Sequence, residues 1–373
     1  MILHLTNDYS GSTVYQNLCR ELDSLGAGQI IYNPILDPKR TGKNKIVFKN
    51  PDSKIIYSPI LSLYTRINYR AKIKRQLNDI QQKISLEKIS IIHAHTLFSD
   101  GGVAYEIYKK HKIPYCITIR NTDLNIFFKY MFHLRSYGIE ILKNASQIIF
   151  ISPVYIERFK KMLCLQEQKK ELEKKYIFIP NGIDNYWLEN TQARKQTVSN
   201  PVKLLYIGKF TRGKNVMRLA KAVEKLNKEG LNCHLDIIGE GGKQQEKVKN
   251  FINNKKIFTF HGAIKEKEKL KEMFHKADIF TMPSMTETFG LVYIEALSQG
   301  IPVVYTKNEG IYGTYDYTIG EAVEWMHLED IASGIKRIAT NYSHYNFKPH
   351  EILSNHNWKT IAQKQYNLYQ NFI

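Results

Sequence analysis

The sequence contains little cysteine and no long apolar run. Its four cysteines lie far apart among 373 residues and form no Cys-x-x-Cys pair. This spacing argues against a zinc site or a disulfide framework and fits a reducing compartment. No stretch approaches 18 consecutive apolar residues, so we expect no membrane-spanning helix. The opening residues, MILHLTNDYS, lack the features of a signal peptide, so a cytoplasmic protein is expected.

Acidic residues are outnumbered by basic ones. There are 54 Lys and Arg against 35 Asp and Glu, a formal net charge of +19. Apolar residues make up 43% and charged residues 24%, which excludes a disordered or collagen-like chain. The length predicts about two domains of roughly 150 residues each.

More than half of the basic excess lies in residues 39–88, which hold 13 basic and 3 acidic side chains. Five of these cations share one predicted helix with interleaved apolar residues: Arg66, Arg70, Lys72, Lys74 and Arg75. A basic amphipathic helix is typical of a protein that docks on an anionic membrane surface. The alternative is a solvated helix face.

Short apolar segments alternate with amphipathic ones along the whole chain. This pattern predicts an α/β protein with two doubly wound, Rossmann-like parallel sheets. We expect a first domain over 1–184, a linker over 185–200 and a second domain over 201–355. The predicted strands are Ile2–Leu5, Gln29–Tyr32, Ser90–His93, Tyr115–Ile119, Gln147–Ile151, Ile177–Ile179, Lys203–Ile207, His234–Ile238, Ile257–Phe260, Ile279–Met282 and Pro302–Tyr305.

The segment Pro283–Val304, PSMTETFGLVYIEALSQGIPVV, is the most informative of the chain. Its apolar spacing predicts a helix that begins near Gly290 and stops before Gly300. The first turn of this helix exposes the N–H groups of Phe289, Gly290 and Leu291. A helix N-terminus of this kind is an anion site suited to a diphosphate.

Two glutamates lie at the start of this helix and within it. Glu287 precedes the first turn, and Glu295 follows eight residues later. Because an ionised carboxylate accepts several hydrogen bonds, Glu287 is predicted to hold a sugar and Glu295 a ribose. The alternative is that Glu287 caps the helix and Glu295 pairs with a lysine.

Cationic side chains follow the strand predicted at Lys203–Ile207. Lys209 and Lys214 flank a loop, and Arg212 lies between them. Cations there would stabilise the extra negative charge on a departing diphosphate. The alternative is a solvated basic loop. A second loop near the nucleotide is predicted after the next strand. This loop contains Gly239, Glu240, Gly241 and Gly242. The alternative is a plain turn.

These motifs resemble those of glycosyltransferase family 4, the retaining nucleotide-sugar transferases of GT-B fold, whose signature is E-x7-E. Further segments fit the same pattern: Ile179–Asp184, Ile207–Asn215, Ile237–Gly242, Phe260–Gly262, Ala277–Ser284 and His356–Trp358. The resemblance implies two domains facing across a cleft, and a terminal helix, 356–373, that crosses back onto the first domain. It also implies base contacts from the backbone of Ala263 and Ile264. The family usually has Arg where Lys209 stands.

Candidate residues in the first half follow its predicted strands. Gly11 lies in a loop that, by resemblance, closes over the diphosphate, and Asp8 lies beside it; an ordinary turn is the alternative. Polar residues after two later strands are predicted to contact the sugar or acceptor, with Arg120 as a catalytic candidate. The full set is His93, His95, Arg120, Asn121 and Asp123. Structural hydrogen bonds, including an Arg120–Asp123 pair, are the alternative.

The sequence therefore predicts a sugar transferase that uses a nucleoside-diphosphate sugar as co-substrate and a sugar or lipid-linked oligosaccharide as acceptor. The resemblance implies retention of anomeric configuration and a place in bacterial surface-polysaccharide synthesis. No Asp-x-Asp motif or metal-ligand spacing occurs, so no metal cofactor is expected. The alternatives are a sugar-nucleotide epimerase or hydrolase and a basic nucleic-acid-binding protein. No nucleic-acid motif supports the last of these.

Overall fold

The computed structural model describes residues 1–372, which form two compact units. Unit 1 contains Met1–Ile151, Tyr155–Gly182 and the segment that begins at Trp358, and unit 2 contains Ser152–Val154 and Ile183–Asn357. Ile373, the last residue of the predicted terminal helix, lies outside the described residues. None of the helices in residues 1–372 is both long and apolar enough to cross a bilayer.

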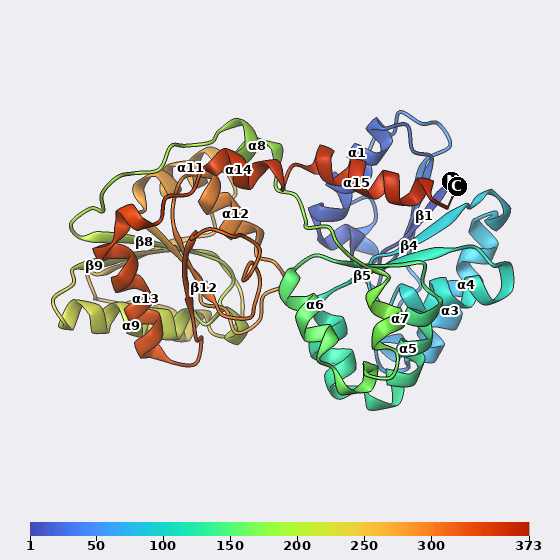
Figure 1. The fold of residues 1–373 in the computed structure, drawn as a ribbon, viewed down its shortest axis with the longest axis horizontal. Coiled ribbons are helices and arrows are strands. Elements are labelled where there is room, and N and C mark those ends of the chain that lie inside the picture. The colour runs from blue at the N-terminus through green and yellow to red at the C-terminus, as the bar shows by residue number, and fades with distance from the viewer. Residues whose placement is uncertain (373) are drawn as a thin grey trace. The chain divides into compact units, whose positions relative to one another are not determined.

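Within the described part of unit 1, seven parallel strands form one sheet in the order β3-β2-β1-β4-β5-β6-β7. Helices cover both faces, with α1 and α15 on one and α3, α4 and α5 on the other (Figure 1). The strands are β1 (Ile2–Leu5), β2 (Gln29–Pro34), β3 (Lys54–Ser58), β4 (Ile91–Ala94), β5 (Tyr115–Ile119), β6 (Gln147–Phe150) and β7 (Tyr176–Phe178). The helices are α1 (Thr13–Ser24), α2 (Leu63–Ile67), α3 (Tyr69–Lys83), α4 (Gly101–His111), α5 (Arg135–Asn144), α6 (Pro153–Lys160), α7 (Lys169–Glu173) and α15 (Trp358–Gln370).

Unit 2 is built in the same way, and its described residues form a six-stranded parallel sheet in the order β10-β9-β8-β11-β12-β13. Helices α9 and α13 pack together on one face (Figure 1). The strands are β8 (Val202–Ile207), β9 (Cys233–Ile238), β10 (Phe258–Gly262), β11 (Ile279–Thr281), β12 (Val303–Thr306) and β13 (Gly320–Val323). The helices are α8 (Asn185–Glu189), α9 (Val216–Lys228), α10 (Gln245–Ile252), α11 (Lys267–Lys276), α12 (Leu291–Ser298), α13 (Leu328–Thr340) and α14 (Pro349–Ser354).

Each sheet has one point at which the strand order reverses. In unit 1 the chain proceeds outward in opposite directions from the neighbours β1 and β4, and in unit 2 from β8 and β11. The loops that leave the carboxyl ends of such neighbours diverge, and the crevice between them is where open α/β sheets bind ligands. The topology therefore marks one candidate binding position in each unit.

The two parallel sheets confirm the predicted fold class, but sequence patterning misses two strands. β3 has the sequence KIIYS and lies at an edge with an exposed lysine, and β13 is the short edge strand GEAV. Neither shows the long apolar run of a strand buried on both faces. The stretch 185–200, predicted as a linker, belongs to unit 2 and begins with helix α8.

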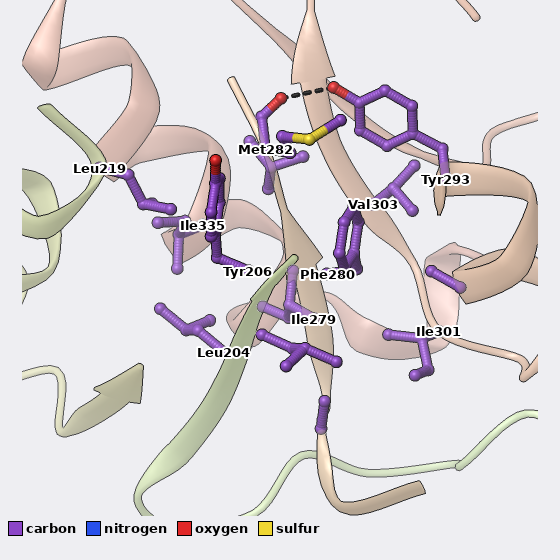
Figure 2. Packing of buried hydrophobic residues seen from close by; sticks show 14 of the residues in the cluster. Leu204, Tyr206, Leu219, Ile279, Phe280, Met282, Tyr293, Ile301, Val303 and Ile335 are labelled. Carbon is purple, nitrogen blue, oxygen red and sulfur yellow. Dashed lines mark hydrogen bonds between the residues drawn. The ribbon is translucent and has the colours of Figure 1, made fainter. Parts of the chain in front are cut away.

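The core of unit 2 fixes the position of α12. Tyr293 of this helix is buried, and its ring packs on Phe280 of β11 with centroids 5.7 Å apart. Figure 2 shows the Tyr293 hydroxyl directed at the carbonyl of Met282, to which it donates a hydrogen bond. Burying an aromatic side chain of this size contributes about 1.5–3 kcal/mol. This packing and the hydrogen bond together attach α12 to the carboxyl end of β11.

Candidate active site

Helix α12 begins at Leu291 and ends at Ser298, within the limits that its apolar spacing predicts. Its N-cap, Gly290, has φ +80°, and a Cβ at this position would lie 2.5 Å from the ring of Tyr293. Both facts require glycine here. The absent side chain leaves the backbone of the first turn open.

The N-terminus of α12 has unused hydrogen-bond donors. Among the described residues, no group accepts from the N–H of Phe289, Gly290 or Leu291, and no side chain caps the helix. These N–H groups carry the positive end of the helix dipole. They lie at the carboxyl end of β11, where the strand order of unit 2 reverses, and N–H groups in such a position are able to bind an anion.

Glu287 and Lys214 meet beside this helix terminus. The Lys214 ammonium lies 2.5 Å from Oε2 of Glu287, and the two side chains are 29% and 13% exposed. Lys214 comes from the loop after β8 and Glu287 from the loop after β11, the two strands at the reversal. The pair places one cation and one carboxylate, both partly accessible, beside the N-terminus of α12.

Asn215 joins these two loops, a role that the sequence does not predict. Its Nδ2 donates to the Pro283 carbonyl at 3.0 Å and to the Trp325 carbonyl at 2.9 Å. Its φ is +58°, a conformation that asparagine tolerates better than most residues. The Met285 N–H adds a 2.7 Å bond to the Gly213 carbonyl. These bonds hold the loops of Lys214 and Glu287 against each other.

Glu309 supports Glu287 from the loop after β12, and sequence reasoning also misses this residue. Oε2 of Glu309 accepts the N–H of Glu287 at 2.9 Å, and the Gly310 N–H donates to the Glu287 carbonyl at 3.1 Å. Glu309 is only 8% exposed. The backbone of Glu287 is therefore held on both sides, which fixes where its side chain begins.

Glu295 lies one helix turn after Leu291, the first residue of α12. Burial raises its pKa to about 7, and the negative charge of Asp184 adds to this effect while Lys267 opposes it. Lys267 is itself paired with Asp184 at 2.6 Å. Glu295 therefore changes protonation near neutral pH, and hydroxyl donors such as those of a ribose would favour its ionised form.

The remaining cations of the β8 loop are accessible. Lys209 and Arg212 are exposed, and neither side chain has a hydrogen-bond or ion-pair partner within residues 1–372. Glu240 and Ala263 are also exposed, and Ile264 is half-buried after β10. All five follow the carboxyl ends of strands β8, β9 and β10 of one sheet.

The glycine loop after β9 packs backbone to backbone on the β8 loop. A Cβ at Gly239 would lie 1.9 Å from the Gly208 carbonyl oxygen, and one at Gly242 would lie 2.4 Å from that of Phe210. The Gly241 carbonyl accepts the Phe210 N–H at 2.8 Å. The glycines are needed for this close approach of the two loops, and the contact with a nucleotide stays a prediction.

We expect Gly239→Ala to lower the free energy of unfolding by at least about 3 kcal/mol, because it combines a clash with φ +146°. Gly241→Ala is the matched control, since no atom lies within 4 Å of its Cβ position and only φ +73° is unfavourable. It should cost about 1–2 kcal/mol. Urea unfolding measures both. Equal losses would contradict the close approach of the two loops.

In unit 1, two predicted acceptor residues have structural contacts. His93 is fully buried, and its ring nitrogens bond Tyr369 of α15 at 2.6 Å and Thr118 at 2.8 Å. Asp123 is fully buried and accepts the N–H groups of Leu97, Phe98 and Arg120 at 2.9–3.2 Å. These contacts support structural roles for both side chains.

Arg120 and Asn121 are half-buried after β5. The Arg120 guanidinium lies 5.4 Å above the ring of Tyr15 and donates to the His95 carbonyl at 3.3 Å. It contacts Asp123 through its backbone N–H, and no side-chain ion pair joins the two among the described residues. Asn121 accepts from Asn125 at 2.7 Å.

The loops at the reversal point of unit 1 are joined through Asp100. Its Oδ1 accepts the Asn7 N–H at 3.1 Å, and its Oδ2 accepts the Thr96 hydroxyl at 2.9 Å. Burial raises its pKa to about 7. Asp8 is exposed nearby and pairs with Arg40 at 3.3 Å, and Gly11 ends a short 3-10 helix in the same loop.

Three histidines lie together in the sheet of unit 1. His4 belongs to β1, His93 belongs to β4, and His95 directly follows β4. Because His4 is far from the other two in sequence, spacing along the chain does not reveal this cluster. One ring nitrogen from each of His4, His93 and His95 lies within 4.8 Å of the others, the separation expected of a metal site. However, both His93 nitrogens are engaged, and His4 Nδ1 lies 3.1 Å from His95 Nε2. The observed contacts support a buried hydrogen-bonded cluster.

This cluster predicts a loss of stability in acid. Burial lowers the pKa of His4 to about 3 and those of His93 and His95 well below 6.5. Below about pH 6.5 the histidines of the unfolded chain bind protons, whereas those of the folded unit stay neutral. The free energy of unfolding is therefore highest above this pH and falls below it. Each histidine contributes about 1.4 kcal/mol per pH unit. Asp100 and Asp123, whose pKa values are raised, act in the opposite direction.

A comparison of variants separates the contribution of the histidines from that of Asp100 and Asp123. Between pH 6.5 and 5, His4→Gln should reduce the pH dependence of urea unfolding by about 1.4 kcal/mol per pH unit. The exposed His111, replaced by glutamine, is the control and should change nothing. An unchanged slope in His4→Gln would mean that His4 titrates normally in the folded protein.

Two family models match the chain. One, described as Glycosyltransferase Family 4, matches residues 11–185, and the other, described as Glycosyl transferases group 1, matches residues 189–349. The boundary between them, at 185–189, falls within α8 at the start of unit 2.

Individual proteins show the same likeness. The putative teichuronic acid biosynthesis glycosyltransferase TuaC of Bacillus subtilis (strain 168) is 23% identical over 68% of this chain and 61% of its own length. The chain thus spans about six tenths of that relative. The alpha-monoglucosyldiacylglycerol synthase of Acholeplasma laidlawii is 23% identical over 77% of this chain and 74% of its own.

The fold likeness extends over both units. The sucrose-phosphate synthase of Thermosynechococcus elongatus has a TM-score of 0.74 at 19% identity and covers 99% of this chain and 98% of its own. The two family models adjoin one another and together span residues 11–349 apart from three positions. The chain therefore belongs to glycosyltransferase family 4, the group 1 glycosyltransferases of GT-B fold.

Proposed function

We propose that this protein transfers a sugar from a nucleoside-diphosphate sugar to an acceptor hydroxyl. The observation that carries the proposal is the open N-terminus of α12 beside the Lys214–Glu287 pair. A diphosphate fits the free N–H groups and the ammonium, and a sugar hydroxyl fits the carboxylate. Family membership supports the same reaction class.

In this proposal, the side chains mainly position the donor and stabilise charge. When the sugar–phosphate bond breaks, the diphosphate gains negative charge, which Lys214 and the N–H groups of Gly290 and Leu291 stabilise. The leaving phosphate oxygen takes the proton that the acceptor hydroxyl loses as its oxygen bonds to the sugar. Glu287 holds the sugar, and Glu295 holds the ribose. Exposed Lys209 and Arg212 supply further positive charge. We propose, by likeness to the family, that anomeric configuration is retained and that no metal ion is required.

Unit 1 is proposed to bind the acceptor, since its strand order also reverses at one position. Two relatives are named for synthesis of teichuronic acid and of a glucosylated diacylglycerol. These names support an acceptor that belongs to a surface polysaccharide or a membrane lipid.

A thermal-shift screen with UDP, GDP and ADP sugars tests the donor side. We expect one nucleotide class to raise the melting temperature, and the same sugar nucleotide to give transfer to a polysaccharide or glycolipid acceptor. Epimerised nucleotide or free monosaccharide, formed without an acceptor, would favour an epimerase or hydrolase. Stabilisation by DNA alone would overturn the proposal.

A further inference from the structure

Unit 1 contains a pocket of about 660 Å³ that begins at its strand-order reversal. At that end it is lined by Asn7, Asp8 and Ser10, which follow β1, and by Ser99, which follows β4. Its other walls come from the segment after β2, from α2, from the start of α3 and from residues 126–134. The pocket therefore joins the expected acceptor position of unit 1 to a second, different surface.

That second surface is apolar and exposed. Around the pocket, Ile67 of α2 is 88% exposed, Ile126 is 45% exposed and Leu36 is 40% exposed. Leu63 and Tyr64, on the same short helix, are 70% and 62% exposed. Exposed apolar side chains gathered at the mouth of a pocket mark an interaction site.

Tyr69 of α3 lines the pocket, but the apolar residues further along this helix do not share the exposed surface. Ile73 and Leu77 are buried, and the Tyr69 hydroxyl donates to the Phe98 carbonyl at 2.7 Å. The predicted single basic helix is in fact two helices, which part at Asn68, the N-cap of α3. Ile73 and Leu77, which alternate with the cations of α3, therefore belong to the core, whereas α2 presents its apolar groups outward.

Cations and aromatic rings surround the same mouth. Arg66 is exposed in the pocket wall, and the ammonium of Lys72 reaches the Ser99 hydroxyl at 2.9 Å. Tyr130 and Phe132 are each 64% exposed and flank Met131 of the wall. The Arg135 guanidinium lies 4.2 Å above the Phe132 ring. Basic and aromatic residues beside apolar ones are the composition of a surface that meets a bilayer.

The pocket lining carries two carboxylates as well. Asp8 is paired with Arg40, and Asp37 accepts the N–H of Lys39 at 3.0 Å. With Asp8 paired with Arg40, the cations Arg66 and Lys72 remain against the single carboxylate of Asp37, so the rest of the lining has an excess of one positive charge. The chemistry therefore complements a lipid that has an anionic head group and apolar chains.

We propose that α2 and the apolar rim formed by Leu36, Ile67 and Ile126 dock on an anionic bilayer, and that the head group of an anionic lipid enters the pocket toward Arg66 and Lys72. This docking is independent of donor chemistry. Vesicle binding without any nucleotide sugar tests it, so its failure leaves the proposed transferase activity unaffected.

The experiment measures sedimentation with vesicles of equal phosphatidylglycerol and phosphatidylcholine. Ile67→Glu should weaken binding at least tenfold, because it removes an inserted apolar group and adds a negative charge. Val47→Glu makes the same charge change at a 92% exposed residue that does not line the pocket, and should bind normally. Equal loss in both variants would overturn the proposal.

A second pair of variants tests the cations. Arg66→Gln should weaken binding about fivefold, as expected for one cation near an anionic leaflet. Arg75→Gln, on the exposed side of α3 and outside the pocket lining, should have a smaller effect. Equal effects would show a diffuse electrostatic attraction and overturn the pocket assignment.

Two further outcomes would also contradict the proposal. One is binding of glycerol phosphate, free in solution, as tight as that of the vesicles, since this would make the pocket a site for a soluble anion. The other is self-association in sedimentation velocity that Ile67→Glu abolishes, since a second copy of the chain would then cover α2. Pure phosphatidylcholine vesicles should bind weakly.

Discussion

Replacement of Glu287 by glutamine is expected to lower kcat/KM for sugar transfer by roughly 100- to 1,000-fold, the range found when one preorganised polar group is removed from an active site. Glutamine keeps the size of the side chain but removes its charge. The carboxylate lies 2.5 Å from Lys214 and is only 13% exposed, so its orientation in the free protein is fixed. Steady-state kinetics with the donor identified by thermal shift measures the effect.

The same variant should bind a nucleoside diphosphate that lacks the sugar at least as well as the wild type. A carboxylate near a diphosphate repels it, and removal of the charge relieves that repulsion. Loss of transfer with retained nucleotide affinity is therefore the expected signature. Glu246→Gln, at a residue whose carboxylate is 77% exposed on α10, is the control. Wild-type turnover in Glu287→Gln would contradict its assignment to the sugar.

Lys214→Ala is expected to weaken nucleoside diphosphate binding by about 10- to 100-fold, which corresponds to loss of one hydrogen bond to a charged group. The ammonium lies in the loop after β8, beside the helix terminus that is expected to hold the phosphates. Isothermal titration calorimetry with the bare diphosphate measures the change without any contribution from sugar contacts.

This variant also leaves Glu287 without its cation, so part of the loss has a second cause. The double variant Lys214→Ala with Glu287→Gln removes that repulsion and should recover some, but not all, of the affinity. Lys228→Ala changes a side chain that is 74% exposed and should bind normally. Wild-type affinity in the double variant would show that Lys214 acts only through Glu287.

The arrangement of α12 was predictable because each local signal agrees with its neighbours. An apolar strand, a glycine at the helix start and Gly300 before a proline fix the helix limits from sequence alone. Loops after parallel strands of one sheet meet at one edge, so Lys214 and Glu287 are expected on the same side. Their direct ion pair depends on β8 and β11 being neighbours, which local patterns do not state.

Contacts made across loops were not predictable for the same reason. Asn215 bonds the Pro283 carbonyl, which lies 68 positions away in the chain. Glu309 bonds the N–H of Glu287, which lies 22 positions away. Their side chains carry no pattern that distinguishes them from ordinary loop residues. The asparagine conformation at φ +58° is visible only in the structure.

Periodicity also leaves the partner of an apolar face undetermined. Ile73 and Leu77 of α3 have the spacing of an amphipathic helix whether they face a membrane or the domain core. The structure buries both and leaves Ile67 of α2 outside. Likewise, His4 joins His93 and His95 only because β1 and β4 pair in register.

The most direct test of the donor site is the structure of this protein with a bound nucleoside diphosphate. We predict that diphosphate oxygens accept hydrogen bonds from the N–H groups of Gly290 and Leu291, and that the Lys214 ammonium contacts a phosphate. A diphosphate bound elsewhere, with Lys214 still held by Glu287 and the first turn of α12 unoccupied, would contradict the account.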